Sequence, residues 1–125
     1  MTILDASAVL GLIQGERRAS SVVHHLADAA ISAVNHAEVI GKLVDVGMPA
    51  SIAAGLLPRL HIEVVPFTQR HALIAGELRP VAAHLGLSLG DRACLATALV
   101  EGDTAVTLDR AWADLDIGIP IVVCS

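Results

Sequence analysis

Residues 2–9 are Thr2-Ile3-Leu4-Asp5-Ala6-Ser7-Ala8-Val9, a short apolar run followed by an aspartate and a second apolar segment. The short run favours a strand, and the residues after Asp5 favour a helix. The same order, a short strand-like run and then a longer helical one, recurs along the whole chain. This alternation predicts an α/β fold in which helices cover a parallel sheet.

The expected elements fill the chain without a linker, internal repeat or low-complexity tract. We expect strands at residues 2–4, 30–33, 62–65, 104–108 and 120–123. We expect helices at residues 6–14, 17–29, 35–46, 49–60, 68–84 and 88–100, and a single helical turn at 110–115. Pro80 should kink or interrupt the helix in which it lies. The prediction is one domain over residues 1–125, a three-layer α/β/α sandwich with a central parallel sheet of about five strands.

The composition predicts a folded chain with more apolar surface than one copy can bury. Hydrophobic residues make up 54% and charged residues 17% of the sequence, which excludes intrinsic disorder. Mean hydropathy is +0.68, yet no stretch approaches the ~20 apolar residues of a membrane span. No basic segment precedes an apolar one at the N-terminus, so we expect no signal peptide. A surplus of this kind indicates an oligomer interface or a partner groove.

Charge and aromatic content exclude two common kinds of nucleic-acid binder. The net charge is -5 and Lys42 is the only lysine, so a broad basic face is excluded. Phe67 and Trp112 are the only aromatic rings of the Phe, Tyr or Trp type, too few for stacking along single strands. Cys94 and Cys124 lack metal-ligand spacing, and a buried free thiol at Cys94 indicates a reducing, cytoplasmic setting.

Four carboxylates follow strand-like runs or lie near the starts of expected helices: Asp5, Glu38, Asp91 and Asp109. Ligands of open α/β sheets bind outside the carboxyl ends of the strands. Carboxylates gathered there would repel one another, which would raise their pKa values unless a divalent cation lay between them. The remaining acidic residues that we considered are expected on solvated helix faces or turns: Asp28, Asp45, Glu63, Glu77, Glu101 and Asp103. The six histidines show no zinc spacing and are expected at the surface or partly buried: His24, His25, His36, His61, His71 and His84.

Each carboxylate also has a purely structural explanation. Asp5 and Asp109 could cap the helical segments that follow them. Residues 35–38 and 88–91 fit capping boxes completed by Glu38 and Asp91. Capping does not require four carboxylates to gather at one edge of a sheet, whereas metal-assisted phosphate chemistry does.

Four segments, taken in order, resemble the PIN-domain family, and within it the VapC-type toxins of bacterial toxin–antitoxin pairs. Residues 4–9 are similar to the family's opening motif, an aspartate followed two residues later by Ser or Thr. Residues 32–39 are similar to its glutamate segment, and residues 107–112 to its last acidic segment. Residues 87–98 (LSLGDRACLATA) match the third segment most closely.

The resemblance implies a parallel five-stranded sheet, dependence on Mg²⁺ or Mn²⁺, ribonuclease activity, a homodimer and a cognate VapB-type antitoxin that blocks the site. A dimer interface and a groove for an antitoxin helix would account for the apolar surplus, and we expect them along the helices between Arg17 and Leu60. The resemblance assigns metal binding and catalysis to four acidic residues: Asp5, Glu38, Asp91 and Asp109. It assigns supporting polar contacts to Ser7 and Thr107. The last acidic position varies in the family, so Asp114 and Asp116 remain alternatives to Asp109.

The leading hypothesis is metal-dependent cleavage of single-stranded or loop RNA. Four arginines are candidates for contacts with the RNA phosphates: Arg17, Arg18, Arg92 and Arg110. A role as solvated surface residues explains them equally well. A haloacid-dehalogenase-type phosphatase needs Asp-x-Asp after the first strand, where this chain has Asp5-Ala6-Ser7. A receiver domain needs a lysine late in the sheet, which Lys42 is not. A PIN-fold binding module without catalysis remains the non-enzymatic alternative.

Overall fold

The structure, a computed structural model, describes residues 1–125 and contains one sheet of five parallel strands. The strand order is β3-β2-β1-β4-β5. The strands are β1 (Thr2–Leu4), β2 (Ala29–Ser32), β3 (Glu63–Val65), β4 (Thr104–Thr107) and β5 (Ile121–Val123). The α-helices are α1 (Ala6–Ile13), α2 (Ala33–Asp45), α3 (Ala50–Ala54), α4 (Leu56–Arg59), α5 (Gln69–Glu77), α6 (Arg79–Leu85) and α7 (Leu89–Glu101), and the 3₁₀ segments are η1 (Arg17–Asp28) and η2 (Arg110–Asp114).

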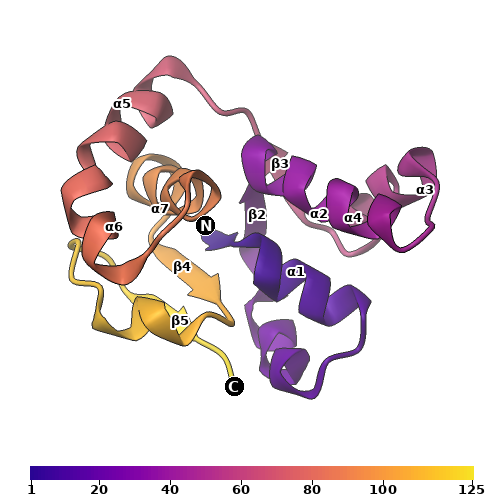
Figure 1. Cartoon of the computed structure of the whole chain (residues 1–125). Coiled ribbons are helices and arrows are strands. Elements are labelled where there is room, and N and C mark those ends of the chain that lie inside the picture. Colours follow the sequence, from indigo (N-terminus) through magenta and orange to yellow (C-terminus); the bar gives the residue numbers. More distant parts are fainter.

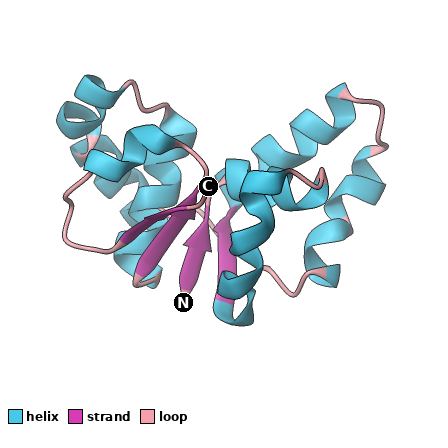
Figure 2. Ribbon diagram, turned by 90° about the horizontal axis from the view of Figure 1, so that it is seen from below, coloured by secondary structure: helices cyan, strands magenta, loops and turns pink.

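Helices cover both faces of the sheet, which confirms the predicted three-layer α/β/α fold (Figure 2). Helices α5 and α7 lie on one side, and α1 to α4 lie on the other (Figure 1). Successive side chains of a strand point to opposite faces. Accordingly, Ile3 packs in a cluster with Leu95 and Trp112, whereas Leu4 packs in a second cluster with Val39 and Leu57. The sheet is therefore buried from both sides, as the apolar strands predicted.

Burial decreases from the centre of the sheet to its edges. All four residues of β2 are buried, whereas two of the three residues of the edge strand β3 are exposed. None of the helices is long and apolar enough to cross a membrane.

Two predicted helices are each divided in two, and proline explains both breaks. The segment predicted at 68–84 becomes α5 and α6, with Pro80 in the first turn of α6, where its missing N–H is tolerated. The segment predicted at 49–60 becomes α3 and α4 with Gly55 between them. Continuous helix would require the ring of Pro58 to clash with the carbonyl four residues earlier.

Residues 17–28 form 3₁₀ rather than the predicted α-helix. Long 3₁₀ runs are uncommon because their hydrogen bonds have poorer geometry. This segment contains paired Ser, Val and His residues, which are weak α-helix formers. Its Ala19 and Val22 are nevertheless buried in the core cluster that contains Leu4.

The start of α2 corrects one prediction about the candidate site. Ser32, not Asn35, is the N-cap, and its Oγ accepts a hydrogen bond from the Val34 N–H at 3.2 Å. Strand β2 therefore ends at Ser32, and Asn35 lies inside the helix. The predicted capping box of Asn35 and Glu38 is wrong, because Ser32 caps the helix three residues earlier.

His71 corrects the expectation that every histidine lies at least partly at the surface. Its side chain is 0% exposed. Nδ1 accepts a hydrogen bond from the Thr68 N–H at 2.8 Å, and Nε2 lies 3.2 Å from Glu101 Oε1. Both ring nitrogens thus face polar groups, so the ring can be buried at the start of α5.

Truncation of the buried side of α7 should destabilise the fold. Leu95 is 1% exposed, and we expect Leu95→Ala to lower the free energy of unfolding by about 2–5 kcal/mol in urea denaturation. The matched control is Leu73→Ala, because Leu73 is also helical but 64% exposed. The control should change stability by no more than about 0.5 kcal/mol. Equal losses in the two variants would contradict the packing described here.

Candidate active site

The strand order creates a topological switch point between β1 and β4. From β1 the chain adds β2 and β3 on one side, and it later adds β4 and β5 on the other. Both neighbours pair with β1 in parallel. Ligands of open α/β sheets bind outside the carboxyl ends of the strands at such a point. Asp5 follows β1 directly and Thr107 ends β4.

The carboxylate of Asp5 links the two strands through side-chain hydrogen bonds. Oδ1 accepts from Ser7 Oγ at 2.7 Å and from the Ala8 N–H at 2.9 Å, and Oδ2 accepts from Thr107 Oγ1 at 2.6 Å. Both hydroxyls also accept backbone N–H groups, Ser7 from Leu108 at 3.0 Å and Thr107 from Asp109 at 2.9 Å. Each hydroxyl therefore directs its single proton to Asp5.

Burial raises the pKa of Asp5 to about 6. Asp5 is only 4% exposed, and the loss of solvation disfavours its charged carboxylate. The three hydrogen bonds from Thr107, Ala8 and Ser7 oppose this effect, and the charge of Asp91 adds slightly to it. The sequence predicted a raised pKa from mutual repulsion; the direction is right for Asp5, but burial is the main cause.

Glu38 lies on the exposed side of α2 and faces the first turn of α7. Its Oε1 accepts a hydrogen bond from Asn35 Nδ2 at 2.8 Å, and the same nitrogen donates to the Gly90 carbonyl at 2.9 Å. A Cβ placed on Gly90 would lie 2.5 Å from both oxygens of Glu38. The Glu38 carboxylate therefore lies directly over Gly90, the residue that precedes Asp91 in the chain.

Asp91 is half-buried and completes the capping box that the sequence predicted. Its Oδ2 accepts from the Ser88 N–H at 2.9 Å, and its own N–H donates to Ser88 Oγ at 3.1 Å. One turn further along α7, Cys94 is fully buried, as predicted. Burial, together with the charges of Asp5, Asp91 and Glu38, raises the Cys94 pKa well above its ordinary value. These three carboxylates therefore lie near the same buried side chain.

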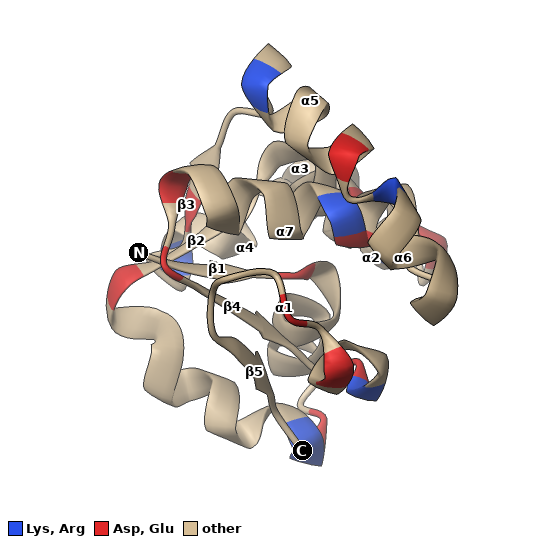
Figure 3. Cartoon of the chain, turned by 90° about the vertical axis from the view of Figure 1, so that its left-hand side faces the viewer, with Lys and Arg blue, Asp and Glu red and all other residues tan.

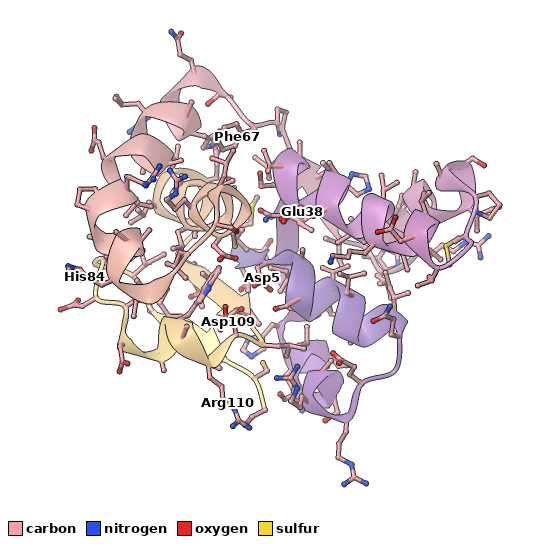
Figure 4. All side chains as sticks on the ribbon, in the orientation of Figure 1. Asp5, Glu38, Phe67, His84, Asp109 and Arg110 are labelled. Carbon is pink, nitrogen blue, oxygen red and sulfur yellow. The ribbon has the colours of Figure 1, made fainter.

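Asp109 is exposed and lies on the β4 side of the same sheet edge (Figure 4). Its Oδ1 accepts from the Ala111 N–H at 2.9 Å, so it caps η2. Asp114 and Asp116 are also exposed, and Asp114 lines a separate pocket of about 410 Å³ with His84 and Pro80. Neither residue has a hydrogen bond that leads to Asp5. The Asp109 N–H, in contrast, donates to the Thr107 hydroxyl, which donates to Asp5.

The residues fit a hard divalent cation in chemistry, although the carboxylates are not gathered as a finished ligand set. No three His, Cys, Asp or Glu side chains lie close enough together to hold a metal ion. Asp91 and Asp109 each direct one oxygen to a backbone N–H of their own cap. The donors are nevertheless all oxygen atoms, which Mg²⁺ and Mn²⁺ prefer. Ser7 and Thr107 orient Asp5 in the way that outer hydrogen bonds orient metal ligands.

Sequence reasoning missed Asn35 and Gly90 as contacts of Glu38. The available signal was the spacing of Asn35 and Glu38, since residues three apart share a helix face. The contact to Gly90 crosses 55 positions of the chain and had no local signal.

Comparison with known proteins identifies the family. The PIN domain matches residues 2–118, and the chain belongs to this family. This membership sets aside the haloacid-dehalogenase and receiver alternatives. Comparison with curated protein sequences found no match.

Solved structures show the same fold in toxin–antitoxin complexes. The VapBC2 structure from Rickettsia felis, bound to a DNA fragment from their promoter, matches with a TM-score of 0.72 at 18% identity, over 99% of this chain and 98% of that chain. A toxin–antitoxin complex from Klebsiella pneumoniae matches with a TM-score of 0.65 at 18% identity, over 92% of each chain. FitAcB from Neisseria gonorrhoeae matches with a TM-score of 0.66 at 21% identity, over 98% of this chain and 96% of that chain.

The raised pKa of Asp5 predicts a pH-dependent stability. The folded state holds the Asp5 proton more tightly than the unfolded chain, whose ordinary value is 3.8. The resulting stabilisation is fully present below about pH 4 and is lost as the pH rises through about 6. Asp5→Asn stays neutral, so between pH 4 and pH 8 its free energy of unfolding should fall by on the order of 2 kcal/mol less than that of wild type.

Urea denaturation across this pH range measures the effect, and the free energy of unfolding of Asp5→Asn relative to wild type should rise from pH 4 to pH 8. Asp45→Asn, at an exposed carboxylate, serves as the control and should follow the wild-type profile. A constant difference between Asp5→Asn and wild type at every pH would show that burial does not raise the pKa of Asp5.

Proposed function

We propose that this chain is a metal-dependent endoribonuclease and the toxin of a toxin–antitoxin pair. The observation that carries the proposal is a buried carboxylate at the switch point, Asp5, held by Ser7 and Thr107. Desolvating this charge destabilises the ionised fold, so stability alone does not explain an aspartate here. Family membership and the toxin–antitoxin complexes with the same fold support the assignment.

Asp5, Glu38 and Asp91 would hold Mg²⁺ or Mn²⁺, directly or through water, and Asp109 would complete the site. When bound, such an ion lowers the pKa of a bound water and offsets charge on the transferring phosphate. Asp5 contributes a carboxylate with fixed orientation, because two hydroxyls and one backbone N–H direct their protons to it. Asp91 and Asp109 each use one carboxylate oxygen in a cap, so the other oxygen of each would be available to the ion.

The substrate would be single-stranded or loop RNA. Lys and Arg residues are spread over several elements and form no broad basic face (Figure 3). Arg92 is a poor candidate for phosphate binding, because it is half-buried, unlike the exposed Arg18 and Arg110. Its Nη1 also donates to the Ala75 carbonyl at 3.0 Å and joins α7 to α5. Arg18 donates to the Leu108 carbonyl at 3.3 Å, beside Asp109, and Arg110 follows Asp109 in η2. These two arginines are the better candidates for contacts with RNA phosphates.

Exposed apolar side chains support a homodimer and an antitoxin of the VapB type. Within the predicted region between residues 17 and 60, four large apolar side chains are 45–70% exposed: Val23, Val44, Val46 and Ile52. A partner that covers them would remove this surface from water. A cytoplasmic setting agrees with the two free, buried cysteines.

RNA cleavage tests the proposed activity. Wild type should cleave RNA only with added Mg²⁺ or Mn²⁺, and Asp5→Asn and Glu38→Gln should each reduce the rate by about 100-fold or more, as when groups that stabilise a transition state are removed. Labelled RNA fragments resolved on gels give the rate.

Glu77→Gln changes an exposed glutamate of α5 and is the matched control, which should cleave at the wild-type rate. Equal cleavage by wild type and Asp5→Asn would refute the assignment. Absence of cleavage with either metal would instead favour a PIN-fold binding module.

Association tests the partner proposal. In light scattering after size-exclusion chromatography, wild type should have twice the 12.9 kDa mass of one chain. The double variant Val46→Asp/Ile52→Asp should shift toward a monomer, because charges are costly in an apolar interface. Leu73→Asp changes an exposed side chain of α5 outside residues 17–60, and it should leave the mass unchanged. A stable wild-type monomer would contradict the proposal.

A further inference from the structure

Asn35 is a buried polar residue in the first turn of α2. It is 1% exposed, yet it does not cap the helix. Its Oδ1 accepts no hydrogen bond. A buried amide oxygen without a partner destabilises a fold, and asparagine is a weak helix former. The contacts of its amide nitrogen are therefore the feature that explains an asparagine at this position.

The side-chain amide of Asn35 joins two elements through one nitrogen. Nδ2 donates one proton to Glu38 Oε1 at 2.8 Å and the other to the Gly90 carbonyl at 2.9 Å. Both partners are acceptors, so only this orientation of the amide satisfies them. Asn35 therefore connects the Glu38 side chain on α2 to the first turn of α7.

Gly90 supplies the space that this arrangement needs. Its missing Cβ would lie 2.5 Å from Glu38 Oε1 and Oε2, a separation that real Cβ atoms essentially never show. The backbone at Gly90 has no positive φ that would itself require glycine. Gly41 and Gly76 are also helical, but a Cβ at either position would meet nothing within 4 Å.

Glu38 depends on these two contacts more than the other carboxylates depend on theirs. Asp5 is held by two hydroxyls and Asp91 by its capping box. Glu38 is exposed and has a long, flexible side chain, and Asn35 is its only side-chain hydrogen-bond partner. Without Asn35 and the open space over Gly90, the carboxylate would be free to turn toward solvent.

We propose that Asn35 and Gly90 are positioning residues that hold the Glu38 carboxylate beside Asp91 for cation binding and RNA cleavage. The inference rests on the proposed function and adds to it two residues that do not themselves touch the reacting atoms. Loss of an outer contact to a metal ligand typically weakens metal affinity or activity by about 10–100-fold.

Gly90→Ala tests the inference without removing any polar group. The clash falls on the end of a flexible side chain, so Glu38 should move and the fold should remain intact. We expect Mn²⁺ affinity, measured by calorimetric titration, to fall about 10–100-fold, with a parallel fall in cleavage rate. The melting temperature should be unchanged or higher, because alanine is the better helix former.

Gly41→Ala and Gly76→Ala are the matched controls, since they change helical glycines that have open space. Both should keep wild-type Mn²⁺ affinity. The variant Glu38→Ala provides a second test: if Gly90 acts through Glu38, adding Gly90→Ala to it should cause no further loss of Mn²⁺ affinity.

Asn35→Asp keeps the size of the side chain and replaces the donating amide with a carboxylate that repels Glu38. It should also lose about 10–100-fold in Mn²⁺ affinity. If wild type binds Mn²⁺ and cleaves RNA, and Gly90→Ala keeps the same Mn²⁺ affinity, the positioning role is refuted and the proposed function stands. Absence of Mn²⁺ binding by wild type would overturn the proposed function and the positioning role together. Loss of affinity accompanied by a lower melting temperature in Gly90→Ala would indicate a structural role and would also overturn the inference.

Discussion

The geometry at the switch point depends on one buried carboxylate. Asp5 accepts hydrogen bonds from the hydroxyls of Ser7 in α1 and Thr107 in β4. These hydroxyls in turn accept hydrogen bonds from the N–H groups of Leu108 and Asp109. One network thus fixes the end of β1, the start of α1 and the turn after β4. Burial makes the charge unfavourable and raises the pKa of Asp5 to about 6. The fold therefore holds a carboxylate in fixed orientation, with a charge that a bound cation would stabilise.

Capping and metal binding are compatible at most of the acidic positions. Asp5, Asp91 and Asp109 each accept a backbone N–H at the start of a helical segment, so each has a structural role. Asp91 and Asp109 each cap with one oxygen, and the other remains available. Both oxygens of Asp5 accept hydrogen bonds, so a cation would bind there through the remaining lone pairs. Glu38 is different, because it caps nothing and is exposed. Its arrangement with Asn35 is the part of the site that local stability explains least.

The sequence predicted the sheet and the order of its helices because short apolar runs and longer periodic segments differ in length and spacing. It predicted the caps at Asp5 and Asp91 because these depend on neighbouring residues. It misplaced the start of α2, since Ser32 and Asn35 are both good N-caps and tertiary packing decides between them. It could not predict the contact from Asn35 to Gly90, which exists only once α2 and α7 pack together.

The scarcity of basic residues constrains how an acidic chain could hold RNA. Arg92 is half-buried and donates to the Ala75 carbonyl, so the exposed arginines next to the turn after β4 are Arg18, beside Leu108, and Arg110. Two arginines supply little of the counterion-release affinity on which most nucleic-acid binding depends. On the proposed function, a cation between the carboxylates would have to supply attraction for the phosphate as well as its chemistry. Substrate binding and cleavage should then share one requirement, so a partner that displaced the ion would prevent both.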